Sequence, residues 1–159
     1  MKTIFMSLVS VLFAATAFAM PTMGDNAVYN VTISQGGQSM QGTLESTITA
    51  ANNGSYTVES KINLGGQSQV QNQQRSEQEM VSDALVGQIL GNCAQYGGKL
   101  ETVTVPAGTF NTCALPADPQ DGTGFTWVGQ VAFGVVKVDT TDTQGQKTYA
   151  ELQSFKFGK

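Results

Sequence analysis

The chain has 159 residues with eight basic and twelve acidic side chains and no histidine, so its formal net charge at pH 7 is −4. This acidic balance argues against nucleic-acid partners, whose phosphates are met by basic patches, and against electrostatic adhesion to anionic lipid. Without histidine, the chain lacks His-based acid–base catalysis, Ser–His and Cys–His nucleophile pairs and the commonest zinc ligand. We therefore predict that the protein is not an enzyme, with no catalytic residues, cofactor or metal site.

Residues 1–19 have the features of a secretory signal peptide. Lys2 gives a short basic start, residues 4–15 are almost wholly apolar, and Ala-Phe-Ala at 17–19 supplies the small residues of a cleavage site. The apolar run is too short to span a bilayer comfortably. We therefore expect residues 20–159 to form a single β-rich domain that is exported, either periplasmic or secreted, with no integral membrane span in the mature chain.

Alternating apolar and polar side chains predict a series of strands in the first half of the mature chain. The clearest alternation covers residues 26–34, 42–51 and 55–64, and a short polar strand follows at 67–71. The connections are tight, and the Asn-Gly pair at 53–54 is among the strongest short signals for a β-hairpin. We expect an antiparallel meander with one face buried and the other in water.

The pattern changes from strand to helix at Ser76. Ser76 and Glu79 match a capping box, in which each side chain can satisfy a backbone donor of the other residue. Apolar residues then recur at helical spacing before a plausible stop at Gly91; they are Val81, Ala84, Leu85 and Ile89. These features predict one helix of about 14 residues whose apolar stripe packs on the inner face of the sheet.

A β-hairpin is predicted between the only two cysteines, Cys93 and Cys113. Its strands cover 99–105 and 109–115, and Pro-Ala-Gly at 106–108 forms the turn, with the glycine in a left-handed conformation. An even number of cysteines in an exported chain usually forms disulfides, so we predict a structural bond between these two. The alternatives are free or intermolecular thiols and a redox pair, for which the Cys-x-x-Cys spacing is missing.

Three more strands are expected in the last third of the chain. The first runs from Phe125 toward Phe133, the second covers 135–139 after a bend at Gly134, and the third covers 147–157. In total, the sequence predicts seven to nine strands and one helix.

The hairpin sequence Val-Pro-Ala-Gly-Thr-Phe at 105–110, preceded by Cys and Gly-Gly and followed by Cys, resembles a hairpin in uncharacterised families of exported bacterial β-proteins. The resemblance continues through the Gly-Val-Val-Lys-Val strand at 134–138 and the Leu-x-Ser-Phe ending at 152–155, and covers residues 93–157. These families are similar to periplasmic half-barrel folds of the lipoprotein-carrier type. The resemblance implies a mainly β (β-rich α+β) protein, a curved antiparallel sheet or half-barrel with one helix packed on it, and an exported location. It brings no catalytic residues.

Two groups of acidic residues have a functional and a plain interpretation. Glu77, Glu79 and Asp83 could supply the paired carboxylates of a glycosidase, but acidic side chains also suit a solvated helix start. Residues 118–122 are rich in Asp and Gly, yet they lack the ligand spacing of a calcium loop. We interpret both groups as ordinary surface features.

Aromatic and helical apolar residues are the remaining functional signal. Most such residues form a core, but a half-barrel could also arrange them around an apolar pocket between sheet and helix. The predicted pocket residues are Met80, Leu85, Ile89, Phe110, Phe125, Trp127 and Phe133.

Two functions from different classes follow from this organisation. The first is a non-enzymatic module of the bacterial cell envelope that binds a lipid or another apolar ligand. The alternative is an envelope structural or protein-interaction module, with a filled core and no small-molecule ligand, that uses a sheet edge or its Gln-rich outer face to contact an envelope protein. A hollow interior favours the first function and a filled interior favours the second.

Overall fold

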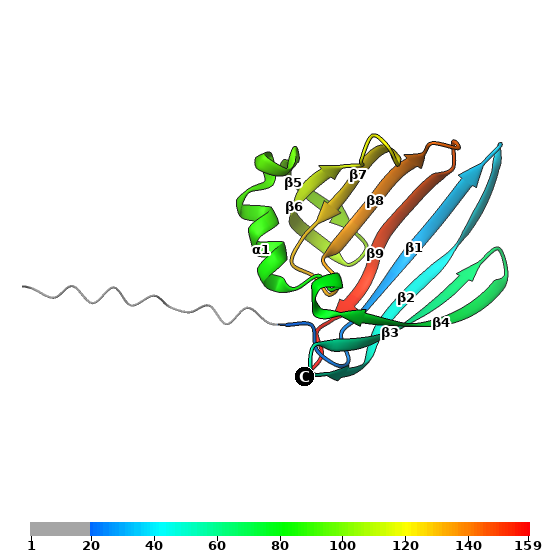
Figure 1. Cartoon of the computed structure of the whole chain (residues 1–159). Helices are drawn as coiled ribbons and strands as arrows, with labels where there is room; N and C mark the ends of the chain where they lie inside the picture. The colour runs from blue at the N-terminus through cyan, green and yellow to red at the C-terminus, as the bar shows by residue number, and fades with distance from the viewer. Residues whose placement is uncertain (1–19) are drawn as a thin grey trace, which may run out of the picture.

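The computed structural model describes residues 20–159; the predicted signal peptide lies outside the described residues. Nine strands, one α-helix and two short 3₁₀ helices make up this part of the chain (Figure 1). In chain order they are β1 (Asn26–Gln35), β2 (Gln38–Asn52), β3 (Ser55–Leu64), β4 (Gln67–Ser76), η1 (Glu77–Glu79), α1 (Asp83–Gly91), η2 (Cys93–Tyr96), β5 (Lys99–Val105), β6 (Gly108–Pro116), β7 (Gly122–Val128), β8 (Val135–Asp142) and β9 (Lys147–Lys156).

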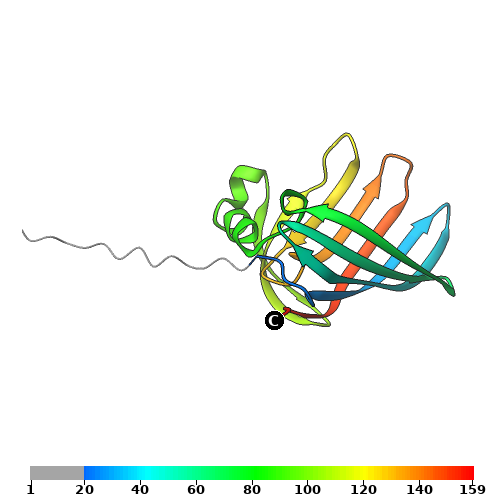
Figure 2. The ribbon, with the colours of Figure 1, turned by 60° about the horizontal axis from the view of Figure 1, so that its bottom comes forward.

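All nine strands belong to one antiparallel sheet with the order β4-β3-β2-β1-β9-β8-β7-β6-β5. Two meanders, β1–β4 and β5–β9, are therefore joined where β1 pairs with β9. The sheet is strongly curved but not closed (Figures 1 and 2), because among residues 20–159 β4 and β5 each have a neighbouring strand on one side only. The predicted fold class, a half-barrel of seven to nine antiparallel strands with one helix packed on it, is confirmed.

Tight turns in the first meander fix its register. Asn53 and Gly54 have φ values of 46° and 77° between β2 and β3. Two consecutive residues at positive φ match the twist of antiparallel strands, which explains the preference for Asn-Gly in two-residue hairpin loops. Gly-Gly pairs at 36–37 and 65–66 have the same backbone signs. The expected meander is thus confirmed, and β4 extends beyond the predicted 67–71.

The predicted helix of about 14 residues is wrong in length, because the chain leaves helical geometry at Met80. Ser76 caps only η1: the Glu79 carboxylate accepts hydrogen bonds from the Ser76 N–H and hydroxyl, each at 2.7 Å. Met80 is extended (φ −94°, ψ 141°) and its side chain is buried in the core. A second cap then starts α1, because the Ser82 hydroxyl accepts a hydrogen bond from the Leu85 N–H at 3.2 Å. Burial of Met80 thus interrupts the predicted helix.

The prediction that the aromatic strand runs on toward Phe133 is also wrong. β7 ends at Val128, and residues 129–134 form a compact loop closed by a hydrogen bond from the Gly129 N–H to the Gly134 carbonyl at 2.9 Å. Phe133 and Gly134 both have positive φ, 63° and 71°. This reversal directs the chain back into β8, so the loop replaces the last residues of the predicted strand.

The core consists of two clusters that Phe133 connects. The larger cluster covers the middle of the sheet and the tip of the β5–β6 hairpin; its buried members are Ala27, Tyr29, Val31, Val105, Val131, Ala132, Val136, Ala150 and Leu152. The smaller one lies under β2 and β3 and contains Ile48, Tyr56, Val58 and Met80. Phe133 packs against both. The positive-φ loop is therefore part of the interior and not a loose surface connection.

The predicted disulfide between Cys93 and Cys113 is present. The two Cα atoms are 5.7 Å apart, and both residues are buried, with 3% and 0% of their surface exposed. The bond joins η2, directly after α1, to the middle of β6. It therefore fastens the helical connection to the β5–β6 end of the sheet, where α1 lies in Figure 1. Within residues 20–159, no helix is long and apolar enough to cross a membrane.

Candidate ligand-binding cavity

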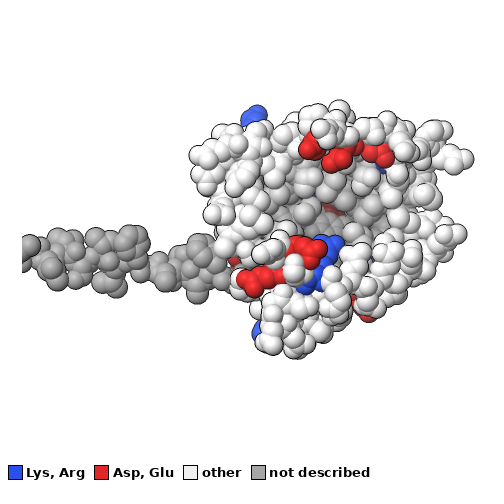
Figure 3. All heavy atoms as spheres, viewed as in Figure 1, with Lys and Arg blue, Asp and Glu red and all other residues white. Residues whose placement is uncertain are grey.

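The concave face of the sheet contains a cavity of about 220 Å³. Its walls come from strands of both meanders and from the β7–β8 loop, and it opens to solvent. Figure 3 shows that this face of the molecule is hollowed. The lining residues are Tyr29, Leu44, Ser46, Val58, Ser60, Arg75, Phe133, Val135, Val138 and Ala150.

The floor of the cavity follows from strand alternation and register. Val138 of β8 lies opposite Ala150 of β9, which lies opposite Val31 of β1, so these side chains share one side of the sheet. Ala150 and Val138 are small, and they leave space above the middle of the sheet. The concave face is therefore apolar at its centre but incompletely filled.

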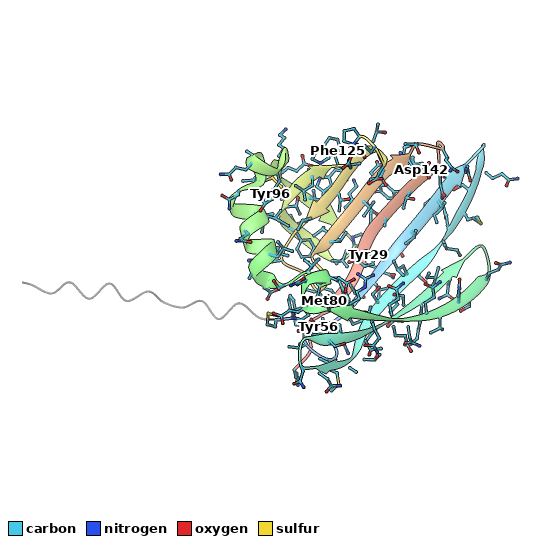
Figure 4. All side chains as sticks on the ribbon, viewed as in Figure 1. Tyr29, Tyr56, Met80, Tyr96, Phe125 and Asp142 are labelled. Atoms are coloured by element: carbon cyan, nitrogen blue, oxygen red, sulfur yellow. A yellow bond between two sulfur atoms is a disulfide. The ribbon has the colours of Figure 1, made fainter. Side chains whose placement is uncertain are left out.

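Tyr29 gives the cavity a wall that is apolar along the ring and neutral at its tip. Its hydroxyl donates a hydrogen bond to the Val135 carbonyl at 3.0 Å (Figure 4 labels Tyr29). Burial raises the pKa of Tyr29 far above its ordinary value. The phenol thus stays protonated and its one donor is used, so this wall offers no free charge.

Phe133 forms another wall, and its position is tightly constrained. A phenylalanine at φ 63° is in a region that bulky residues rarely adopt. The neighbouring Gly134 has no room for a side chain, because a Cβ there would lie 2.5 Å from Val81 Cγ1 and 3.1 Å from Val86 Cγ2. The loop is therefore clamped against the start of α1. Sparsely populated backbone geometry of this kind persists only where packing imposes it, and it is common at binding sites.

Polar side chains occupy the part of the lining that faces β4. The Ser46 and Ser60 hydroxyls are 3.5 Å apart on β2 and β3. Arg75 on edge strand β4 lies opposite Tyr56, and its Nη2 donates to Gln73 Oε1 at 3.0 Å. An apolar floor with a few polar groups on one side is the usual composition of small-molecule sites.

The predicted aromatic residues do not gather around this cavity. Of these residues, Phe133 lines the cavity. Trp127 does not: it shares a cross-strand row with Lys137 and Glu151. This row is on the other side of the sheet from Val138 and Ala150. The Trp127 indole N–H donates to the Glu101 carboxylate, and the Lys137 ammonium is 4.9 Å from the Trp127 ring centroid.

The other two predicted aromatic residues also lie away from the cavity. Phe125 packs beside Trp127, with ring centroids 6.0 Å apart, and is 46% exposed. Phe110 packs edge-on against Phe155 near the hairpin tip, at a centroid distance of 5.9 Å.

The predicted helical residues are likewise only partly involved. Met80 belongs to the smaller core cluster, against which Phe133 packs, and it does not line the cavity. Leu85 is 38% exposed and Ile89 is half-buried. The residue of α1 that is buried is Val86, at 1% exposure. The structure therefore brings Met80 and Phe133 together and leaves Leu85 and Ile89 outside this cavity.

Sequence reasoning missed most of the actual lining. The strand alternation predicts Tyr29, Leu44 and Val58 only as apolar residues of the buried face, and Ala150 only as a member of the strand at 147–157. The signal that identifies them is this alternation, since all four are on the dry side of their strands. Their convergence depends on the curvature of the sheet, which a local pattern does not encode.

Two of the acidic side chains have local hydrogen-bond partners in the structure. Glu79 is held by Ser76, and bonds from the Ser76 backbone and hydroxyl lower the pKa of Glu79. Asp118 accepts a hydrogen bond from the Gln120 N–H at 2.9 Å, as in a local turn. Burial, followed by the nearby Asp25 charge, raises the pKa of Asp83. Within residues 20–159, no three Cys, Asp or Glu side chains are grouped to hold a metal ion.

No protein-family model matches the sequence, and no curated protein matches it. Among solved structures, a candidate exported protein with a YmcC-like fold from Bacteroides fragilis is 12% identical, with a TM-score of 0.46 over 87% of this chain and 98% of that one. MucB of Pseudomonas aeruginosa, solved with MucA, is 14% identical, with a TM-score of 0.45 over 84% of this chain and 52% of that one. This chain thus spans about half the length of the MucB chain. A candidate lipoprotein from Parabacteroides distasonis is 12% identical, with a TM-score of 0.43 over 87% and 98% of the two chains. Similarities this distant carry no conclusion about activity.

Proposed function

We propose that this is an exported, disulfide-stapled, non-enzymatic β-protein whose concave face binds a hydrophobic ligand in the cell envelope. The observation that carries the proposal is the cavity of about 220 Å³ with apolar walls on an open face. Apolar surface of this kind is unfavourable in water, and a ligand that covers it gains the corresponding hydrophobic free energy. The signal-peptide features and the buried disulfide support export, because disulfides persist in oxidising compartments.

The size of the cavity limits the ligand. Drug-sized molecules occupy pockets of about 300–1,000 Å³. A cavity of about 220 Å³ is smaller, so it suits one chain or one compact apolar group. The remainder of a longer molecule would extend through the opening.

A second candidate function rests on the free sheet edges. β4 is ten residues long and almost wholly exposed, and β5 carries Leu100 with 60% of its surface exposed. Exposed edges can accept a strand from another chain. In this role the protein would be an interaction or structural module of the envelope, and the cavity would have no ligand.

Native mass spectrometry of protein purified from the bacterial envelope separates the two functions. A ligand-binding protein should carry extra mass that organic extraction removes. A Ser60→Phe variant, which fills the cavity from β3, should lose this mass. The matched control is Asn63→Phe, which adds the same ring on the exposed outer side of the same strand and should keep it.

Circular dichroism and urea unfolding must show that both variants fold. The ligand-binding proposal fails if the folded wild-type protein carries no extractable molecule and shows no saturable binding of any alkyl compound. That outcome, together with capture of an envelope protein that β4 or β5 edge substitutions abolish, would establish the interaction module instead.

A further inference from the structure

We infer that the cavity selects a single-chain alkyl carboxylate, and that Arg75 binds its head group. This inference rests on the proposed ligand-binding function and adds the chemical class of the ligand. Arg75 is the only arginine in the sequence, and among residues 20–159 it is the only charged residue that lines the cavity. Its place on edge strand β4 puts the charge at one side of a hollow whose other lining residues are uncharged.

The guanidinium of Arg75 has donors available for an anion. The ion pairs within residues 20–159 are Lys61–Glu59 and Lys147–Asp139, so Arg75 has no carboxylate within salt-bridge distance. A guanidinium carries five N–H donors, and the Arg75 side chain uses one of its terminal nitrogens on Gln73 Oε1. Planar paired donors suit the two oxygens of a carboxylate.

The charge of Arg75 lowers the pKa of Glu79, but the Glu79 carboxylate does not accept hydrogen bonds from the Arg75 N–H groups. Its carboxylate already accepts two hydrogen bonds from Ser76 at 2.7 Å, which are the main causes of its lowered pKa, and the Arg75 charge adds to the same effect. The charge of Arg75 is thus felt nearby, but its N–H groups are not consumed by a protein carboxylate.

The dimensions of the hollow favour one alkyl chain. A water molecule occupies about 30 Å³ in the liquid, so about 220 Å³ has room for on the order of seven groups of that size. That is enough for a short run of methylenes of one chain and too little for two alkyl chains side by side. Ser46 and Ser60 add hydroxyl donors within the same lining.

The net charge favours a carboxylate head over a phosphate. The chain is acidic overall, and Glu77 and Glu79 directly follow β4, on which Arg75 lies. A phosphate monoester carries up to two negative charges at neutral pH, and only one arginine is present to neutralise them. A singly charged head meets the single cation with less repulsion from these acids.

The test is isothermal titration of the mature protein with four ten-carbon probes: decanoate, decyl phosphate, decanol and decyltrimethylammonium, each below its micelle-forming concentration. We expect decanoate to bind most tightly. Arg75→Gln should weaken decanoate on the order of tenfold, the effect of losing one charge-assisted contact, and leave decanol unchanged. The matched control is Lys61→Gln, which removes an exposed cation from the outer side of β3 and should change neither affinity.

Each outcome decides a different point. If no probe binds, the proposed function itself fails. If decanol binds as tightly as decanoate and Arg75→Gln changes neither, ligand binding stands and the head-group assignment is overturned; tighter binding of decyl phosphate overturns the carboxylate. Should Arg75→Gln not fold, Arg75→Lys and the salt dependence of the wild type replace it. Decanoate affinity must then fall with added salt while decanol affinity does not, and equal responses reject the inference.

Discussion

Removal of the Cys93–Cys113 disulfide should destabilise the protein by an amount that depends on the length of the loop between the two cysteines. The cysteines are 20 residues apart in the sequence. In the chain-entropy model, opening a loop of about 20 residues releases about 3 kcal/mol of denatured-state entropy. For a domain of this size, 1 kcal/mol corresponds to about 3–5 °C in Tm, so the double variant Cys93→Ser/Cys113→Ser should melt about 10 °C lower. Serine hydroxyls at two buried positions would add to the loss.

Urea unfolding of oxidised wild type, reduced wild type and the double serine variant measures this effect. The reduced wild type is the control, because it has the native side chains without the cross-link. Thiol labelling under denaturing, non-reducing conditions should find no free cysteine. Equal unfolding free energies for oxidised and reduced protein, or two labelled thiols before reduction, would refute the reasoning.

Three further predictions concern the disulfide, the outer face and alkaline pH. Gly98→Ala should cost about 1–3 kcal/mol, because its Cβ would lie 2.7 Å from Cys113 Sγ and 2.9 Å from both Cys93 Sγ and the Ala114 carbonyl oxygen. Gly91→Ala, at the open end of α1, is the control and should be neutral or slightly stabilising in the same urea assay. Trp127 fluorescence should not change when an alkyl ligand fills the cavity, because the indole is on the opposite side of the sheet. As a control, Glu101→Gln should change the Trp127 fluorescence, because it alters the hydrogen bond of the indole N–H. Burial, with the hydrogen bond and charge of Glu151, raises the pKa of Tyr149 to about 12. In the unfolded chain this proton is lost near pH 10, at the ordinary pKa of tyrosine. The contribution of Tyr149 to the free energy of unfolding should therefore be complete below pH 10 and be lost as pH rises from 10 to 12. The Tyr149→Phe variant should lose less stability over the same pH range.

Most strands could be predicted because their signals are local. The Asn53-Gly54 turn needs two residues at positive φ, and this sequence pair supplies them at low cost. The β5–β6 hairpin is equally local, although its turn contains only Pro106 and Ala107: Gly108, predicted in the turn, begins β6 and lies opposite Val105. The disulfide prediction also needed only the cysteine count and the export signal.

The presence of one helix could be predicted, but its interruption at Met80 and the β7–β8 loop could not, because tertiary contacts determine them. The spacing of Met80 fits a helix. Its side chain is instead buried in the smaller core cluster with Ile48 of β2 and Tyr56 of β3. Phe133 has high strand propensity, yet it is held at φ 63° by packing against both core clusters. In both cases burial of one large side chain outweighs the local preference.

The cavity exists because large and small side chains are distributed unequally between the two sides of the sheet. Trp127 and Tyr149 are on the outer side, where they flank the Lys137 ammonium at 4.9 and 5.3 Å. The inner positions beside them in sequence are Val128 and Ala150. A strongly curved sheet needs bulky inner residues to fill its hollow, and here two bulky aromatic residues of β7 and β9 point outward instead. Because Trp127 and Tyr149 point away from the concave face, the space above Val138 and Ala150 is not filled by their rings, and Tyr29 and Phe133 form its aromatic walls.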